Sequence, residues 1–203
     1  MSDPRNIFAK ISAALSLVLI IGTAAVAKRH SDPAFANINI KNFGKMDDRF
    51  YRGAQPDESD YKDLKALGIQ TVIDLTDSPK SYEKRDVEAL GMRYVNIPMS
   101  DSSYPKEESI NAFLKLVNDP ETGKFYVHCA GGRHRTGVMG AVYRFNKYNW
   151  NFDQVYAEMK KFDFYTSWGH GAYKDFVQDY YEKMQVAKAS GHSSTAITAV
   201  RAQ

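Results

Sequence analysis

The stretch from Tyr126 to Gly137 reads Tyr-Val-His-Cys-Ala-Gly-Gly-Arg-His-Arg-Thr-Gly and constrains the fold more than any other part of the chain. An apolar run with strand character, 125–127, leads into it, and apolar residues at helical spacing follow from Val138. A loop between a strand and a helix N-terminus gathers backbone amides and the positive end of the helix dipole. The sequence therefore predicts an oxyanion-binding loop over residues 129–135, with a helix beginning at Thr136.

Four side chains in this stretch have predicted chemical roles. A positive nest favours a thiolate, so Cys129 is predicted to be a nucleophile with a lowered thiol pKa. The planar fork of Arg135 matches two phosphoryl oxygens. Thr136 can direct its hydroxyl at the sulfur, and His128 is predicted to support the loop by hydrogen bonding.

The remaining loop residues are predicted to bind the substrate phosphate together with Thr136; they are Ala130, Gly131, Gly132, Arg133 and His134. Gly131 and Gly132 allow backbone angles that a Cβ would oppose, so successive amides can face inward. Arg133 and His134 are expected to add positive potential at the rim. Cys129 could instead be a buried core cysteine, but the surrounding glycines and arginines favour the catalytic interpretation.

Short strands and helices alternate along the rest of the chain. Strands are predicted at 50–56, 71–75 and 92–99, and helices at 57–67, 81–90, 106–117, 151–162 and 172–184. This alternation predicts an α/β fold, with a central, mostly parallel sheet flanked by helices and ligands at the carboxyl ends of the strands. The strand at 50–56 could also be a simple edge strand ended by glycine and proline.

The motif formed by His128, Cys129, Arg135, Thr136 and Gly137 resembles the signature of the cysteine-dependent protein tyrosine phosphatase superfamily. The run from Gly132 to Gly137 is most similar to its atypical dual-specificity branch, known from plants, fungi and bacteria. The segment Phe50 to Pro56 resembles the entry segment of the bacterial and fungal members. The resemblance implies a dual-specificity-phosphatase-like fold and hydrolysis of phosphomonoesters through a phosphocysteine intermediate.

The resemblance also implies a general acid, because the leaving oxygen must be protonated. In the dual-specificity family this acid is an aspartate on a loop upstream of the cysteine, and Asp101 matches it in order and spacing. Asp74 and Asp77 are competitors at another strand end. Each of these aspartates could also serve only in a turn or a helix cap.

Composition limits the remaining possibilities. The chain has 203 residues, 43% of them hydrophobic, which suits one ordinary domain with tails. The net charge of +3 and the lack of a long basic block argue against a nucleic-acid partner. Cys129 is the single cysteine, so the chain can form no internal disulfide and no cysteine-rich metal site. We predict no metal and no cofactor.

The N-terminus has the features of an export signal. Arg5 and Lys10 precede an apolar stretch from Ile11 to Ala27, and two small-residue motifs resemble cleavage sites. We predict that residues 1–36 form an export signal or a membrane anchor, which would place the protein in the bacterial periplasm or on the inner membrane. The catalytic domain is predicted at 37–186, followed by a flexible tail at 187–203.

Three classes of function remain open at this stage. The first is a protein tyrosine or dual-specificity phosphatase, and the second is a phosphatase of inositol phosphates or phosphoinositides. A non-catalytic phosphate-binding module, or a sulfur- or arsenate-handling enzyme, is the third. The partner is thus a phosphorylated protein or a small phosphate ester, and the oligomeric state is not predicted.

In the connector 163–171, Tyr165, Trp168 and His170 could flank a substrate, although an aromatic lid packed on the domain is favoured.

Overall fold

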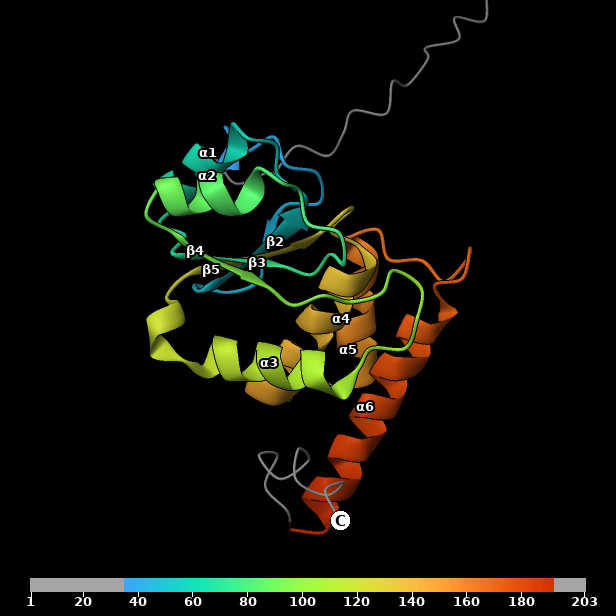
Figure 1. The fold of residues 1–203 in the computed structure, drawn as a ribbon. Helices are drawn as coiled ribbons and strands as arrows, with labels where there is room; N and C mark the ends of the chain where they lie inside the picture. Colours follow the sequence, from blue (N-terminus) through green and yellow to red (C-terminus); the bar gives the residue numbers. More distant parts are fainter. Residues whose placement is uncertain (1–34, 192–203) are drawn as a thin grey trace, which may run out of the picture.

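The computed structural model describes residues 35–191 and shows one twisted sheet with helices on both faces (Figure 1). The strands are β1 (Gly44–Lys45), β2 (Phe50–Ala54), β3 (Thr71–Asp74), β4 (Arg93–Asn96) and β5 (Phe125–Cys129). They are arranged in the order β1-β2-β5-β3-β4. All neighbouring pairs are parallel except β1 and β2. The predicted α/β fold with a mostly parallel sheet is confirmed.

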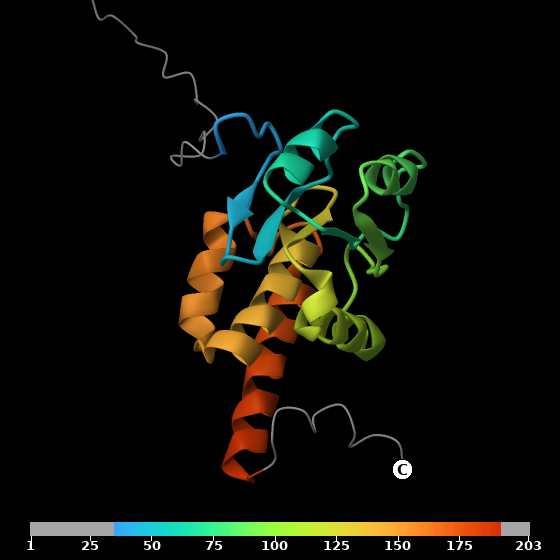
Figure 2. The same cartoon turned by 90° about the vertical axis from the view of Figure 1, so that its left-hand side faces the viewer.

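The helices form a thin layer and a thick layer on opposite faces of the sheet. Figures 1 and 2 show α1 (Asp60–Ala66) and α2 (Glu83–Ala89) on one face. The other face is covered by α3 (Glu107–Asn118), α4 (His134–Tyr143), α5 (Phe152–Lys161) and α6 (Gly171–Ala189). The described part of the chain also contains the short 3-10 helix η2 (Pro120–Thr122) and the π-helix η3 (Arg144–Tyr148). β2 and β5 lie far apart in the sequence but pair in parallel, so their carboxyl ends, at Ala54 and Cys129, lie side by side.

Local sequence explains where the helices begin and end. The α1 helix stops before Gly68, which has a φ of +82°, a value that glycine adopts without strain. The α5 helix begins with a capping box, in which Asn151 accepts from the Gln154 amide while the Gln154 side chain accepts from the Asn151 amide. These signals lie in the sequence itself, and the helices were accordingly predicted within a few residues of their ends.

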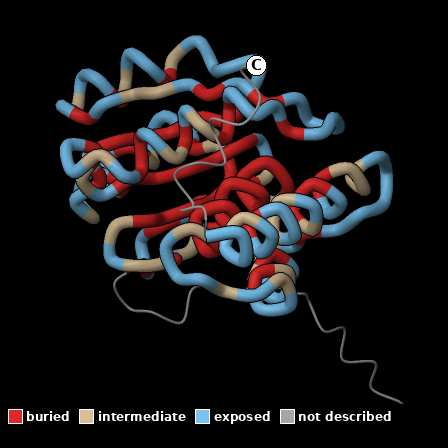
Figure 3. Tube along the Cα trace, turned by 90° about the horizontal axis from the view of Figure 1, so that it is seen from below, coloured by how far each residue is buried: buried red, intermediate tan, exposed pale blue. Residues whose placement is uncertain are grey.

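Two hydrophobic clusters hold the layers together. The larger lies between the sheet and the four-helix layer and includes Phe50, Phe113 and Phe125. The smaller lies under α1 and α2 and includes Tyr61 and Leu64. Each fully buried apolar side chain stabilises the fold by about 1.5–3 kcal/mol before the loss of chain entropy. Figure 3 shows the buried segments in the centre of the molecule and the exposed ones around it.

The structure corrects three details of the prediction. The β2 strand is not at the edge, because β1 pairs with it on the outer side, and β1 was missed since two residues carry no periodic pattern. The α4 helix begins at His134 rather than Thr136, so Arg135 lies in its first turn. The α6 helix continues to Ala189, inside the range 187–203 that was predicted to be a tail.

The predicted export signal or anchor, including the apolar stretch from Ile11 to Ala27, lies outside the described residues. Within residues 35–191, no helix has both the length and the apolar character needed to span a membrane.

Candidate active site

A pocket of about 230 Å³ opens at the carboxyl ends of the central strands. It is lined by Asp101, Cys129, Ala130, Gly131, Arg133, His134, Arg135, Tyr165 and His170. These residues come from the segment after β4, the end of β5 with the loop after it, the first turn of α4, and the connector between α5 and α6. Of the predicted site residues, Gly132, Thr136 and His128 do not line the pocket but lie in the wall behind it.

The loop carbonyls are held from outside by the N-terminal part of the domain. The Gln55 amide donates to Ala130 O (3.3 Å), the Asn42 side chain to Gly131 O (2.9 Å), and Arg52 Nη2 to Gly132 O (2.7 Å). Three successive carbonyls therefore have partners on β2 and the segments beside it. Carbonyls held in this way leave the amides of the same loop free to face an anion in the pocket.

Glycine is required at one of the two predicted positions. Gly132 has a φ of +65°, and a Cβ there would lie 2.4 Å from the backbone carbon of Gly53. Gly131 has no positive φ, and its Cβ would meet only the Arg133 side chain, at 3.8 Å. The prediction that Gly131 is needed for an unusual backbone angle is therefore wrong, although the residue does line the pocket.

The surroundings of Cys129 favour the thiolate. Burial alone would raise the pKa of the thiol, but hydrogen bonds from the side chain and amide of Thr136, the charge of Arg135 and the amide of Gly131 outweigh it. The pKa of Cys129 is consequently lowered from its ordinary value. The Thr136 hydroxyl is fully buried and has no nitrogen or oxygen partner within residues 35–191, which leaves it to the sulfur. A lowered pKa makes a thiol a nucleophile at neutral pH.

Arg135 is held in place by the segments that follow β3 and β4. Its Nη1 donates to Met99 O at 3.2 Å and lies 3.5 Å from a carboxylate oxygen of Asp77. The side chain is only 10% exposed, yet it borders the pocket. This arrangement presents the rest of the guanidinium to a bound phosphoryl group.

Asp101 is the predicted acid that the structure brings to Cys129. It is exposed and lines the pocket, on a loop that is fixed by a 2.5 Å hydrogen bond from the Tyr173 hydroxyl to Ser100 O. The competitor Asp74 is fully buried and accepts hydrogen bonds from Thr76 and Tyr94, so it cannot reach a substrate. Asp77, the second competitor, contacts Arg135 instead.

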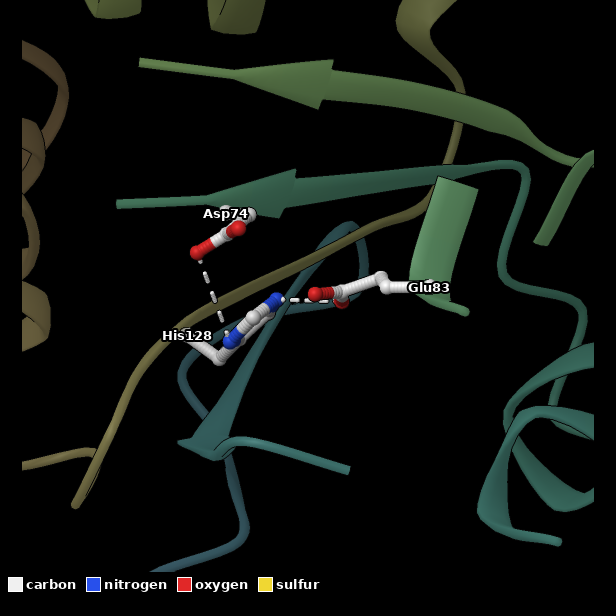
Figure 4. A group of neighbouring side chains, drawn as sticks. All are labelled: Asp74, Glu83 and His128. Atoms are coloured by element: carbon white, nitrogen blue, oxygen red, sulfur yellow. Dashed lines mark ion pairs between the residues drawn. The ribbon is translucent and has the colours of Figure 1, made fainter. Parts of the chain in front are cut away.

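His128 lies behind the loop between two buried carboxylates (Figure 4). Its Nε2 is 2.8 Å from a Glu83 oxygen, and its Nδ1 is 3.9 Å from an Asp74 oxygen. Burial alone would lower the pKa of His128, but the ion pair with Glu83 outweighs it and the pKa is raised. Burial would raise the pKa of Glu83, and its contact with His128 lowers it. His128 therefore supports the wall behind the loop through an ion pair with Glu83.

Asp74, Glu83 and His128 could also be considered as a metal site. Within residues 35–191 they are the group whose possible ligand atoms lie close enough together for a metal ion, all within 4.8 Å of one another. The geometry fits an imidazolium better. The two nitrogens of His128 point at different carboxylates from opposite edges of the ring, and one ion can bind only one of them. Both Asp74 oxygens already accept hydrogen bonds from Thr76, and one also accepts from Tyr94.

The pocket rim differs from the prediction at His134 and in the connector 163–171. His134 stacks on His170 with ring centroids 3.7 Å apart, and burial together with the neighbouring His170 lowers the pKa of His134 to about 4. His134 is therefore neutral at pH 7 and adds no positive charge. Tyr165 and His170 line the pocket rather than forming a packed lid, and Trp168 is 91% exposed.

Four residues of the wall behind the loop were missed as site residues. Arg52 lies in a segment that resembles the family, which was a usable signal. Asn42, Asp74 and Glu83 carried no sequence signal for this role, because only the folded chain shows that they contact the loop and His128.

Comparisons with known proteins agree with this geometry. A probable tyrosine-protein phosphatase of Dictyostelium discoideum is 29% identical over 127 residues, covering 60% of this chain and 75% of that protein. An inositol diphosphatase of Oryza sativa is 29% identical over 129 residues, covering 60% of this chain and 56% of that protein. The crystal structure of a variant of Pseudomonas aeruginosa TpbA with phosphotyrosine has a TM-score of 0.62 at 19% identity, covering 82% of this chain and 99% of that one.

A sequence model of the tyrosine phosphatase family matches residues 37–199, which include every residue of the pocket and of the wall behind it. The signature around Cys129, the α/β fold and this match agree, and the chain belongs to the cysteine-dependent tyrosine phosphatase family.

Proposed function

We propose that the protein hydrolyses phosphomonoesters through a phosphocysteine intermediate, with Cys129 as nucleophile, Arg135 as phosphate ligand and Asp101 as general acid and base. The observation that carries this proposal is the meeting of these three residues, from the end of β5, the first turn of α4 and the loop after β4, in one pocket around a thiol with a lowered pKa. Ala130, Gly131 and Arg133 complete the phosphate site.

The reaction proceeds in two steps. In the first, the Cys129 sulfur attacks phosphorus, the S–P bond forms, and the ester P–O bond breaks as Asp101 protonates the leaving oxygen. In the second, water attacks phosphorus, the Asp101 carboxylate takes a proton from that water, and the S–P bond breaks to release phosphate. Arg135 binds two phosphoryl oxygens throughout and strengthens its contacts as charge moves onto them.

The charges and rings around the pocket favour an aryl phosphate. Arg133 and Arg135 are its cationic groups, since His134 is neutral, and each arginine has an aspartate nearby. Ala130 and Gly131 contribute no charge. Tyr165, His170 and the face of His134 offer aromatic surface to a substrate ring. We therefore propose phosphotyrosine in a protein as the preferred substrate.

The inositol phosphates form the second candidate class, because relatives from rice carry the name inositol diphosphatase. A densely charged polyphosphate needs several unpaired cations, and the two arginines of this pocket lie 3.5 and 4.0 Å from Asp77 and Asp163. The local charge balance therefore makes this class the less favoured of the two.

Steady-state kinetics of the purified full-length protein would separate the substrate classes. The assay compares kcat/KM for a phosphotyrosine peptide, the same peptide with phosphoserine, and an inositol pyrophosphate, with Cys129→Ser as the blank. We expect the phosphotyrosine peptide to give the highest value. A higher kcat/KM for the inositol pyrophosphate would contradict the proposed substrate class while leaving the phosphocysteine chemistry intact.

We also propose that the enzyme works outside the cytoplasm, free in the periplasm or tethered to the inner membrane. The support is the sequence of residues 1–36, with its apolar stretch from Ile11 to Ala27 and the basic residues before it. An alkaline-phosphatase fusion after Asn37 should be active in bacterial cells. An inactive fusion that is expressed at a normal level would contradict the proposal.

A further inference from the structure

Arg52, on β2, is a buried cation with few partners. It is 1% exposed, and its Nη2 donates to Gly132 O at 2.7 Å. Its guanidinium carbon lies 4.1 Å from the centre of the Phe162 ring. Its Nε has no hydrogen-bond partner within residues 35–191. A buried polar group that remains unpaired in a native structure calls for a functional explanation.

The comparison with Arg144 shows what Arg52 lacks. Arg144 is also buried, also donates to a backbone carbonyl (Met46 O, 2.9 Å) and also stacks on an aromatic ring (Trp150, 4.3 Å). In addition, it forms two hydrogen bonds with the Glu158 carboxylate, at 2.6 and 2.9 Å. Among the ion pairs of the described residues, none involves Arg52.

Cys129, in the active site, is the first of the negative groups that act on Arg52. In the parallel pairing of β2 with β5, Arg52 lies opposite Val127, two residues before Cys129. Burial lowers the pKa of Arg52 to about 10, so it is still charged at neutral pH, and the Cys129 thiolate is the strongest charge opposing that shift. The other titratable groups that act on Arg52 are Tyr126, Glu158, which is already paired with Arg144, and Arg144 itself.

The same guanidinium fixes the loop. Gly132 packs so closely on β2 that a Cβ there would lie 2.5 Å from Gly53 O, and its own carbonyl is held by Arg52. If that carbonyl turned into the pocket, its partial negative charge would oppose both the thiolate and the substrate phosphate.

We propose that Arg52 is a positioning residue of the phosphatase reaction, which holds the Gly132 carbonyl away from the pocket and stabilises the Cys129 thiolate with a buried charge that no carboxylate neutralises. It touches neither the substrate nor the reacting atoms, and acts through the loop. This inference rests on the proposed role of Cys129 as nucleophile.

The test measures the thiol pKa directly, from the rate of iodoacetamide alkylation against pH. Cys129 is the only cysteine in the chain, so the readout belongs to that residue. Three variants change the charge and the donor of Arg52. Arg52→Met removes charge and donor, Arg52→Gln removes the charge but keeps a donor, and Arg52→Lys keeps the charge. Arg144→Met is the matched control, because it removes a buried arginine that is paired.

We expect the thiol pKa to rise by about one unit in Arg52→Met and Arg52→Gln and to stay near the wild-type value in Arg52→Lys. At pH values below the thiol pKa, kcat/KM for an aryl phosphate should fall by about tenfold in the two neutral variants, because about tenfold less of the thiolate is present. Arg144→Met should lower the melting temperature without moving the thiol pKa.

Several results would overturn the inference. A wild-type thiol pKa that persists in both neutral variants, or an equal shift in Arg144→Met, would remove the role of Arg52 and leave the function intact. If both neutral variants fail to fold, Arg52 is a structural residue and the inference is also wrong. An ordinary thiol pKa in the wild-type protein would overturn the proposed function as well.

Discussion

The catalytic loop has two sides of opposite character. The pocket side, formed by Cys129, Ala130, Gly131, Arg133 and Arg135, meets solvent and Asp101. The buried side contacts Arg52 and the ion pair of His128 with Glu83, beside Asp74. The pocket side comes from one stretch of sequence and an aspartate, whereas the buried side is gathered from β2, β3 and α2. The reacting groups therefore lie on the pocket side, and the buried charges that stabilise the loop lie on the other side.

This division predicts that pocket-side substitutions reduce turnover without loss of stability. Replacement of the nucleophile, Cys129→Ser, should lower kcat by at least about 10⁴-fold, since the covalent step is lost. Binding of orthophosphate should persist, because the loop amides and Arg135 remain, and isothermal titration calorimetry can measure it. Hydrolysis of an aryl phosphate at more than a small fraction of the wild-type rate would contradict the covalent mechanism.

The general acid should give the second largest effect. Asp101→Asn is expected to slow esters with poor leaving groups by about 10²–10⁴-fold and activated aryl esters far less, since a good leaving group needs little protonation. Asp77→Asn is the matched control: it changes an aspartate that contacts Arg135, so any loss should be equal for both esters. If Asp101→Asn slowed both esters equally, the acid would have to be sought elsewhere.

Buried-side substitutions should instead cost stability. His128→Gln leaves Glu83 and Asp74 buried without their cation, and breaking a buried ion pair in this way costs about 3–5 kcal/mol. Denaturant unfolding would measure this loss. Arg133→Gln, on the exposed rim, should change stability by no more than about 0.5 kcal/mol. Equal losses in the two variants would remove the distinction between the two sides.

The smallest expected effect is a contrast between two histidines. The pKa of His128 is raised by Glu83, so its contribution to stability is complete at low pH and is lost as pH rises through the raised value. The pKa of His134 is lowered to about 4 by burial, so its contribution is present above pH 6.5 and is lost as pH falls through about 4. NMR titration of the histidine ring protons should show the two values on opposite sides of 6.5.

An NMR titration in which both histidines gave pKa values near 6.5 would contradict both accounts. If His134 alone titrated normally, its stack on His170 would be absent in solution and the rim would carry the positive charge first expected of it.

The sequence predicts most of the residues on the pocket side of the loop and few of those on the buried side. The loop, its strand and its helix are contiguous, so their periodicity and glycines predict the site directly, and Asp101 followed from resemblance. The Glu83 contact with His128 joins residues on α2 and β5 that only the parallel pairing of β3 with β5 brings together. The neutrality of His134 was mispredicted because it depends on burial and on His170, which arrives from the connector after α5.

The most direct test of the account is to trap the covalent intermediate. A phosphotyrosine peptide is mixed with the full-length protein, turnover is stopped with acid within milliseconds to seconds, and the peptide containing Cys129 is analysed by mass spectrometry. The account predicts a phosphoryl group on the Cys129 sulfur. Asp101→Asn should accumulate more of it when the substrate is an activated aryl phosphate, because that ester forms the intermediate without an acid while the variant cannot activate the hydrolytic water. Turnover that proceeds without phosphorylation of Cys129, or with the phosphoryl group on another residue, would contradict it.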